Sequence, residues 1–179
     1  MNLPNKITLL RVFFIPVYLF VYLARPLSHM PNMWLALTIF SVAAITDAVD
    51  GYIARRYKLV TNFGKLMDPL ADKLLVSAAL IAFVASGAVP AWAVVVLISR
   101  EFYISGLRQV AVEQGKVLAA SGLAKFKTVA QMVLIIYILL PIEFFKFDWL
   151  VMAILIITVA ASVLSAVQYT WKNRDVLTF

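Results

Sequence analysis

The chain has 179 residues with no cysteine, which excludes disulfides and thiolate metal sites. Hydrophobic residues make up 64% of the sequence and charged residues only 14%, which excludes an ordinary soluble domain and is typical of integral membrane proteins. The net charge of +7 fits membrane topology and anionic headgroups better than nucleic acid, so no nucleic-acid partner is expected.

Six apolar segments are long enough to cross about 30 Å of hydrocarbon, which takes roughly 20 residues of helix. The first is expected at about residues 8–25, after a short interfacial N-terminal segment that contains Pro4. The others are expected at about residues 32–57, from 64 or 69 to 87, 90–112, 123–140 and 148–171. The sequence shows no clear internal repeat. We therefore predict one all-α membrane domain over residues 1–179, with six transmembrane helices.

Basic residues are divided unevenly between the two sides of these helices. The side formed by connections 26–31, 86–90 and 141–148 holds only Arg25 and Lys146. The other side holds Lys6, Arg11, Arg55, Arg56, Lys58, Lys65, Arg108, Lys116, Lys125, Lys127, Lys172 and Arg174. Because cytoplasmic connections carry the excess of Lys and Arg, this pattern places both termini in the cytoplasm.

Four aspartates, Asp47, Asp50, Asp68 and Asp72, lie within 26 positions, although the chain has only nine acidic residues. They follow the pattern D-x2-D-G-x2-A-R-x8-G-x3-D-x3-D. Spacings of three and four residues put each pair on one helical face. A short connection makes the two helices antiparallel neighbours, so the two faces can meet near the cytoplasmic ends of the helices.

Four converging carboxylates would repel one another strongly unless cations hold them together. Oxygen ligands without nearby Cys or His select hard cations such as Mg²⁺, Mn²⁺ or Ca²⁺ rather than Zn²⁺. Gly51 leaves room for a ligand to approach the backbone, Ala54 keeps the same stripe narrow, and Arg55 offers a planar fork for phosphate. The pattern therefore suits a metal-bound nucleotide diphosphate.

Two other interpretations of the aspartates stay open. An aspartate in a membrane helix can pair structurally with Lys or Arg, and cation or proton transporters also use intramembrane carboxylates. The four aspartates gather near one face instead of following a path through the bilayer. Broken helices at the midplane, which are typical of transporter sites, are not evident. Both points favour an enzyme.

The segment Asp47–Asp72 resembles the complete signature of the CDP-alcohol phosphotransferase family. The similarity continues through Asn2–Arg11, NFGKLMDPLADKLLVSAAL, Arg100–Phe102, Gly106–Arg108 and Trp171–Asp175, and is greatest to members from Gram-positive bacteria. The resemblance implies a multi-pass homodimer in the bacterial cytoplasmic membrane, with two divalent cations (Mg²⁺ or Mn²⁺) in a cytoplasmic active site. It also implies transfer of the phosphatidyl group from CDP-diacylglycerol to sn-glycerol 3-phosphate with release of CMP, the first committed step of phosphatidylglycerol synthesis.

The same resemblance assigns roles to individual residues. Asp47, Asp50 and Asp68 would bind one metal ion, and Asp47, Asp68 and Asp72 would bind the other. Asp72 would also be the general base that takes the proton from the acceptor hydroxyl. The cytidine diphosphate part of the substrate would be held by Thr8, Asp47, Asp50, Gly51, Ala54, Arg55, Thr61 and Gly64.

Acceptor choice must come from cationic residues outside this motif. We predict that the acceptor phosphate is bound by Arg100, Arg108, Lys125 and Lys127. The alternatives are an internal salt bridge of Arg100 with Glu101 or an aspartate, and snorkelling of the two lysines to lipid headgroups. Ser105 and segment 123–128 depart from the common family pattern without losing a basic residue. Inositol phosphate, serine or phosphatidylglycerol therefore stay open as acceptors.

The remaining charged and aromatic residues near helix ends have simpler explanations. Arg11, Arg56 and Lys58 are expected to set topology or to face lipid headgroups. Interface anchoring is expected for Trp92, Trp149, Tyr169 and Trp171.

Overall fold

The computed structural model describes residues 3–56, 62–116, 122–141 and 147–176, and within these it leaves out the side chains at 3–9, 47–56, 62–69, 72 and 175. The described residues form helices joined by short turns, with no strand among them. The elements are α1 (Leu3–Leu19), the π-helical turn η1 (Phe20–Ala24), α2 (His29–Arg56), α3 (Asn62–Ala85), α4 (Ala91–Glu113), α5 (Gly122–Leu139), α6 (Asp148–Lys172) and the 3₁₀ turn η3 (Arg174–Val176). The predicted all-α fold is therefore confirmed. The largest difference is that α1 begins at Leu3, so the N-terminal segment around Pro4 forms its first turn.

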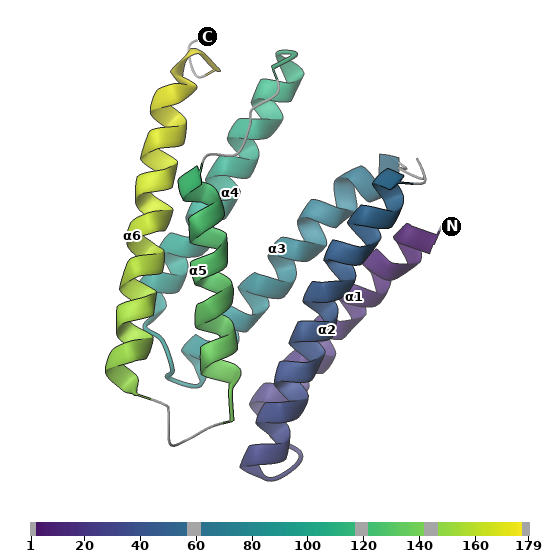
Figure 1. Ribbon diagram of the computed structural model, residues 1–179, viewed down its shortest axis with the longest axis vertical. Helices are drawn as coiled ribbons and strands as arrows, with labels where there is room; N and C mark the ends of the chain where they lie inside the picture. Colours follow the sequence, from purple (N-terminus) through teal and green to yellow (C-terminus); the bar gives the residue numbers. More distant parts are fainter. Residues whose placement is uncertain (1–2, 57–61, 117–121, 142–146, 177–179) are drawn as a thin grey trace. The chain divides into compact units, whose positions relative to one another are not determined.

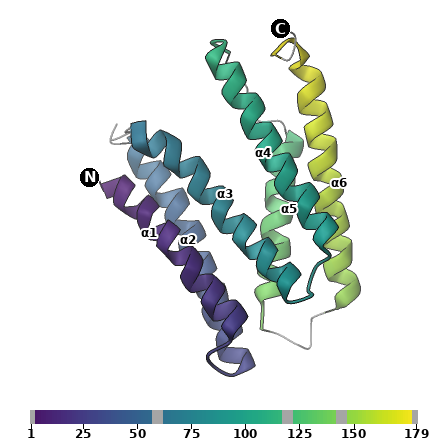
Figure 2. The same cartoon turned by 180° about the vertical axis from the view of Figure 1, so that it is seen from behind.

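The helices divide into two compact units, which are described separately. Unit 1 comprises residues 1–86 with 139–142, and unit 2 comprises residues 87–138 with 143–179. In unit 1, α1 packs against both α2 and α3, and these two also contact each other (Figure 1, Figure 2). Fully buried alanines, such as Ala36, Ala43 and Ala79, allow the helix backbones to approach closely.

An aromatic cluster fixes the register of the three helices in unit 1. The rings of Tyr18 and Tyr22 on one side of the first helix stack with centroids 5.9 Å apart. Phe40 of α2 contacts Tyr18 at 6.1 Å, and Phe83 of α3 contacts Tyr22 edge-on at 5.4 Å. All four rings are buried. A hydrogen bond of 2.9 Å between the hydroxyls of Tyr22 and Ser86 adds a second link to the end of α3.

A tight turn at residues 25–28 reverses the chain between α1 and α2. Arg25 ends η1 in the left-handed conformation, with φ 48°. The buried side chain of Asn32 then accepts a hydrogen bond from the backbone N–H of Leu27 at 3.1 Å and donates one to its carbonyl at 2.7 Å. This double contact closes the turn and holds α1 and α2 antiparallel.

Unit 2 is built around α4 and α6, which pack along each other, with η3 folded back onto α4. Its core includes Ile104, Leu107, Ala111, Tyr169 and Val176. The α4 helix ends in a Schellman motif, in which Lys116 N–H bonds the Ala111 carbonyl at 2.8 Å and Gly115 N–H bonds the Val112 carbonyl at 2.9 Å. Glycine suits this position because its φ is +72°.

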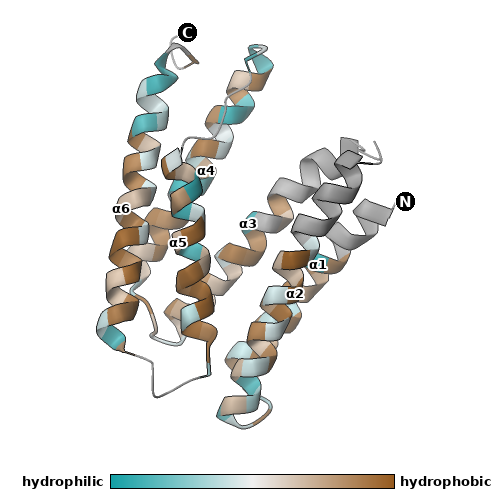
Figure 3. Ribbon diagram, in the orientation of Figure 1, coloured by the Kyte–Doolittle hydropathy of each residue, from teal (hydrophilic) through white to brown (hydrophobic). Residues whose placement is uncertain are grey.

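Two helices in the described part of the chain, α5 and α6, are long and apolar enough to cross a membrane. Shorter apolar stretches cover Leu10–Ala24 and Lys73–Ala85. Hydrophobic residues run along most of α5 and α6 (Figure 3), and many large ones are exposed, including Ile136, Ile157 and Leu164. Such apolar exposure is what a helix bundle surrounded by lipid requires.

Candidate active site

The aspartate motif lies on α2 and α3, on either side of their connection. Asp47 and Asp50 fall in the last third of α2, and Asp68 and Asp72 fall in the first half of α3. The two helices contact each other, so the predicted pairing of neighbouring helices is confirmed. The convergence of the four carboxylates is a prediction that lies outside the described side chains.

The donor set of this motif fits a hard cation. All four candidate ligands are carboxylates, and the chain has no cysteine and a single histidine. That histidine, His29, begins α2 and is 18 residues before Asp47, which corresponds to about 27 Å along the helix. Among the side chains that the structure describes, which do not include these aspartates, no group of three or more His, Asp or Glu could hold a metal ion. Oxygen ligands alone favour Mg²⁺ or Mn²⁺ over Zn²⁺.

Apart from Thr61, the predicted nucleotide contacts fall on the three helices of unit 1, α1, α2 and α3. Thr8 lies in α1, Gly51, Ala54 and Arg55 lie in α2, and Gly64 lies in α3. Their side-chain contacts, and Thr61 altogether, lie outside the described residues. Their roles therefore stay predictions.

The position of Arg11 in α1 contradicts the expectation that this residue sets topology or faces the lipid headgroups. Its side chain is fully buried within unit 1, with 0% exposure. A guanidinium can be buried at low cost only with polar or charged partners, and α1 packs against the two helices that carry the aspartates. The expectation failed because a cation that sets topology and a buried cation have the same appearance in a sequence.

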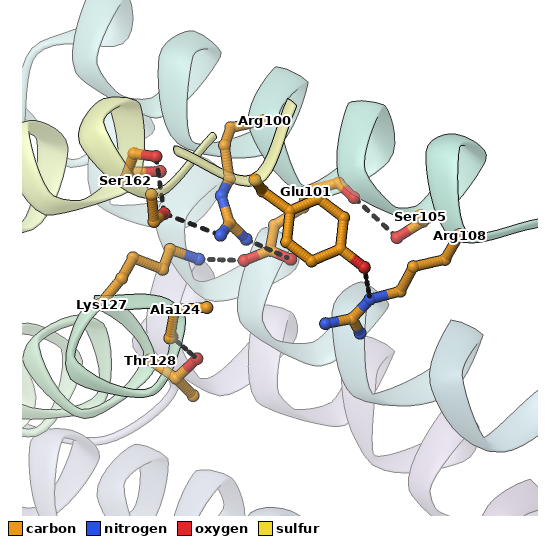
Figure 4. A network of polar contacts seen from close by, with 10 residues as sticks. Arg100, Glu101, Ser105, Arg108, Ala124, Lys127, Thr128 and Ser162 are labelled. Atoms are coloured by element: carbon orange, nitrogen blue, oxygen red, sulfur yellow. Dashed lines mark hydrogen bonds and ion pairs between the residues drawn. The ribbon is translucent and has the colours of Figure 1, made fainter. Parts of the chain in front are cut away.

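A second polar cluster lies in unit 2, around Glu101 of α4 (Figure 4). Lys127 of α5 donates from Nζ to Glu101 Oε1, and Arg100 Nη1 lies 3.7 Å from Glu101 Oε2. The other terminal nitrogen of Arg100 donates to Ser165 Oγ on α6 at 2.8 Å. One carboxylate and one hydroxyl thus connect three helices.

This cluster carries more positive than negative charge. Two cations share one carboxylate, and the side chains of Arg100 and Lys127 are only 9% and 1% exposed. The interpretation that Lys127 snorkels to lipid headgroups is therefore wrong, because its ammonium group points into unit 2 and contacts Glu101. The internal contact of Arg100 with Glu101 is confirmed. It leaves a net charge of +1 that an anionic ligand can neutralise.

Arg108 and Lys125 are both exposed and differ in their contacts. Arg108 donates from Nε to the Tyr169 hydroxyl at 3.1 Å, and its guanidinium lies 5.5 Å from the centre of that ring. The described residues offer its Nη groups no further hydrogen bond. Tyr169 is 3% exposed, so its assignment as an interface anchor is wrong, whereas Trp92, Trp149 and Trp171 are exposed near helix ends as expected.

Three contacts of the predicted cations were not foreseen from the sequence: Glu101 with Lys127, Ser165 with Arg100, and Tyr169 with Arg108. A signal for two of them exists in the sequence of α6. Thr158, Ser162, Ser165 and Tyr169 follow helical spacing along one face of an otherwise apolar helix, and all four are buried. A polar stripe in an apolar helix indicates a face turned toward other polar groups.

Similarity to known proteins identifies the family to which this chain belongs. A family model described as CDP-alcohol phosphatidyltransferase matches residues 1–164, and the chain belongs to this family of membrane proteins, which generally depend on divalent metal ions. A Bacillus subtilis protein named CDP-diacylglycerol–glycerol-3-phosphate 3-phosphatidyltransferase is 45% identical over 192 residues, covering 98% of this chain and 97% of its own length. A Rickettsia bellii protein of the same name is 43% identical over 132 residues, covering 73% of this chain and 71% of its own. A Mycobacterium tuberculosis protein named "Probable phosphatidylglycerophosphate synthase" is 38% identical over 142 residues, covering 79% of this chain and 68% of its own.

Proposed function

We propose that this protein is a transferase that moves the phosphatidyl group of CDP-diacylglycerol to sn-glycerol 3-phosphate. The products are phosphatidylglycerophosphate and CMP. The observation that carries the proposal is the similarity to the Bacillus subtilis protein of that name, at 45% identity over 98% of this chain. The aspartate motif on the contacting helices α2 and α3 supplies the chemistry that such a transfer needs.

In this proposal the four aspartates hold two divalent cations, Mg²⁺ or Mn²⁺, with Asp47 and Asp68 shared between them. When bound, the ions neutralise charge on the diphosphate of the lipid substrate. Asp72 takes the proton of the acceptor hydroxyl as its oxygen bonds to the lipid-linked phosphorus and the bond to CMP breaks. The small residues Gly51 and Ala54 leave space for the nucleotide. Thr8, Arg55, Thr61 and Gly64 complete the proposed contacts to cytidine diphosphate.

The acceptor phosphate is proposed to bind the cations of unit 2. Arg100 and Lys127 share one carboxylate and so keep a net positive charge, and Arg108 keeps its Nη groups available. Lys125 lies exposed one half-turn from Lys127. Arginine forks and lysine ammonium groups are the usual ligands of a phosphate dianion. Inositol phosphate shares that phosphate, so acceptor identity needs a direct assay.

The proposed location is the bacterial cytoplasmic membrane, crossed by six helices, with both termini and the active site on the cytoplasmic side. The supports are the two apolar helices α5 and α6, the shorter apolar stretches of α1 and α3, and the uneven distribution of Lys and Arg. A diacyl chain must stay in lipid while its headgroup reaches the aspartates, which requires a site open sideways to the bilayer. A homodimer belongs to the same proposal through the family resemblance alone.

The test is an acceptor assay with purified protein in lipid nanodiscs. CDP-diacylglycerol is supplied with sn-glycerol 3-phosphate, inositol phosphate, serine or phosphatidylglycerol in turn, and CMP release is measured. CMP release that requires glycerol 3-phosphate supports the proposal, whereas release with another acceptor only would reassign the substrate. Cation or proton flux into liposomes without any CMP would replace the enzyme with a transporter.

A further inference from the structure

Among the described side chains of unit 1, Arg11 is a fully buried cation that the proposed chemistry does not use. It lies on α1 with 0% of its side chain exposed. A buried guanidinium without compensating negative charge would strongly destabilise the fold. The neighbours of α1 in unit 1 are therefore the place to look for that charge.

The antiparallel packing of α1 and α2 fixes which part of α2 lies beside Arg11. Tyr18 of α1 contacts Phe40 of α2, with ring centroids 6.1 Å apart. Arg11 precedes Tyr18 by seven positions, and Asp47 follows Phe40 by seven positions. Seven residues are close to two helical turns, or about 10.5 Å of rise. In antiparallel helices this brings positions 11 and 47 to the same level, on the faces that carry Tyr18 and Phe40.

The parallel packing of α1 and α3 gives an independent result. Tyr22 of η1 lies beside the C-terminal end of α3. Its ring centroid is 5.4 Å from that of Phe83, and its hydroxyl is 2.9 Å from the Ser86 hydroxyl. Arg11 precedes Tyr22 by eleven positions, and Asp72 precedes Phe83 by eleven positions. Eleven residues are close to three helical turns. The π-helical turn at Tyr22 changes this count by at most about one residue, so position 72 lies level with Arg11.

We propose that Arg11 is a positioning residue whose guanidinium is the resident counter-charge of the Asp47 and Asp72 carboxylates. This inference rests on the proposed function, in which those carboxylates bind divalent cations. The side chains of Asp47 and Asp72 lie outside the described residues, so the inference uses the positions of these residues along their helices. Burial of Arg11 between their helices supplies the second, independent observation.

A resident cation and a bound metal ion act on the same carboxylates, so their effects are coupled. Without metal, Arg11 offsets the mutual repulsion of the carboxylates and keeps the helices together. With metal bound, the ions take over much of that task, and repulsion between Arg11 and the ions weakens metal binding. Removing the charge of Arg11 therefore destabilises the metal-free protein more than the metal-bound protein.

The experiment measures thermal unfolding of the full-length protein in detergent, after EDTA treatment and again with saturating Mn²⁺. Wild type is compared with Arg11→Gln, Arg11→Lys and the control Tyr18→Phe. Tyr18 is fully buried two turns further along the same helix face, and Tyr18→Phe changes no charge. The Mn²⁺ affinity of each variant is measured by titrating Mn²⁺ into the EDTA-treated protein and following the unfolding temperature.

We expect the rise in unfolding temperature on adding Mn²⁺ to be larger in Arg11→Gln than in wild type. Mn²⁺ should bind about tenfold more tightly to that variant, or more. Arg11→Lys and Tyr18→Phe should keep the wild-type rise. An equal loss of unfolding temperature with and without Mn²⁺ in Arg11→Gln would make Arg11 a packing residue only and overturn the inference.

Two further outcomes distinguish failure of this inference from failure of the proposed metal site. If Arg11→Gln fails to fold, the double variant Arg11→Gln/Asp72→Asn should recover folded protein, because one repelling charge is gone. Failure of that rescue overturns the inference. If wild type itself shows no Mn²⁺ response, the proposed metal site is wrong, and the role of Arg11 at that site is wrong with it. If Mn²⁺ raises the unfolding temperature of wild type and of Arg11→Gln by the same amount, the role of Arg11 is rejected and the proposed metal site is kept.

Discussion

Lys127 of α5 donates a hydrogen bond to Glu101 of α4, and the same carboxylate lies 3.7 Å from an Nη atom of Arg100. Replacing Glu101 with Gln removes the one negative charge that two largely buried cations share. We expect Glu101→Gln to destabilise the protein by about 1–3 kcal/mol, because breaking a buried pair leaves a cation uncompensated. The carboxylate is 24% exposed, which places the effect toward the lower part of that range.

Thermal unfolding in detergent measures this effect, and the double variant Glu101→Gln/Lys127→Met gives a sharper test. Removal of both partners leaves Arg100 as the main remaining cation, so the double variant should lose less stability than the sum of the two single variants. Glu113→Gln is the control, since Glu113 is exposed at the end of α4. Simple additivity of the two changes would show that the ion pair does not hold α5 to α4.

The contact between Arg108 and Tyr169 predicts an effect on acceptor binding. The Tyr169 hydroxyl accepts from Arg108 Nε at 3.1 Å and orients the guanidinium. Tyr169→Phe should raise the KM for glycerol 3-phosphate about threefold to tenfold, the loss of one hydrogen bond to a charged group. Arg108→Met should raise it further. The KM for CDP-diacylglycerol should stay within twofold in both variants, and a parallel rise in both KM values would argue against an acceptor site here.

Asp72→Asn tests the proposed general base. The amide keeps the shape of the side chain but cannot accept the proton of the acceptor hydroxyl, so kcat should fall by about 10² to 10⁴. Binding of CDP-diacylglycerol should be partly retained, as measured by equilibrium binding in nanodiscs. Asp148→Asn is the control, because Asp148 begins α6 outside the motif, and it should keep near wild-type activity. Full activity in Asp72→Asn would remove Asp72 from the mechanism.

Hydrophobic pattern and motif spacing were sufficient to predict the helices and to assign the aspartates to two helices that contact each other. The predicted segments at 90–112, 123–140 and 148–171 differ from α4, α5 and α6 by one residue or so at each end. Turn residues explain this accuracy, since Gly87 and Gly115 end helices with positive φ and Pro90 caps α4. The early start of α1 was missed, because proline in a first helical turn is compatible with the helix continuing.

Side-chain burial could not be predicted, because it depends on which helix face meets which neighbour. Arg11 and Lys127 are both fully buried cations, yet each occurs in a segment whose other basic residues suit a headgroup region. Tyr169 lies near the end of α6, like an anchor, but its ring is buried against the α4 side of unit 2. The positive-inside rule counts charges in a connection and carries no information about which of them turn inward.

Removal of divalent cations provides the last prediction. The candidate ligands are four carboxylates, so chelation by EDTA should abolish CMP release, and Mg²⁺ or Mn²⁺ should restore it. Zn²⁺ should restore far less, because it prefers nitrogen and sulfur ligands, which this motif does not offer. Asp50→Asn should require a higher Mg²⁺ concentration for half-maximal activity, since one oxygen ligand loses its charge. Activity that survives exhaustive chelation, or that responds best to Zn²⁺, would contradict an all-carboxylate metal site.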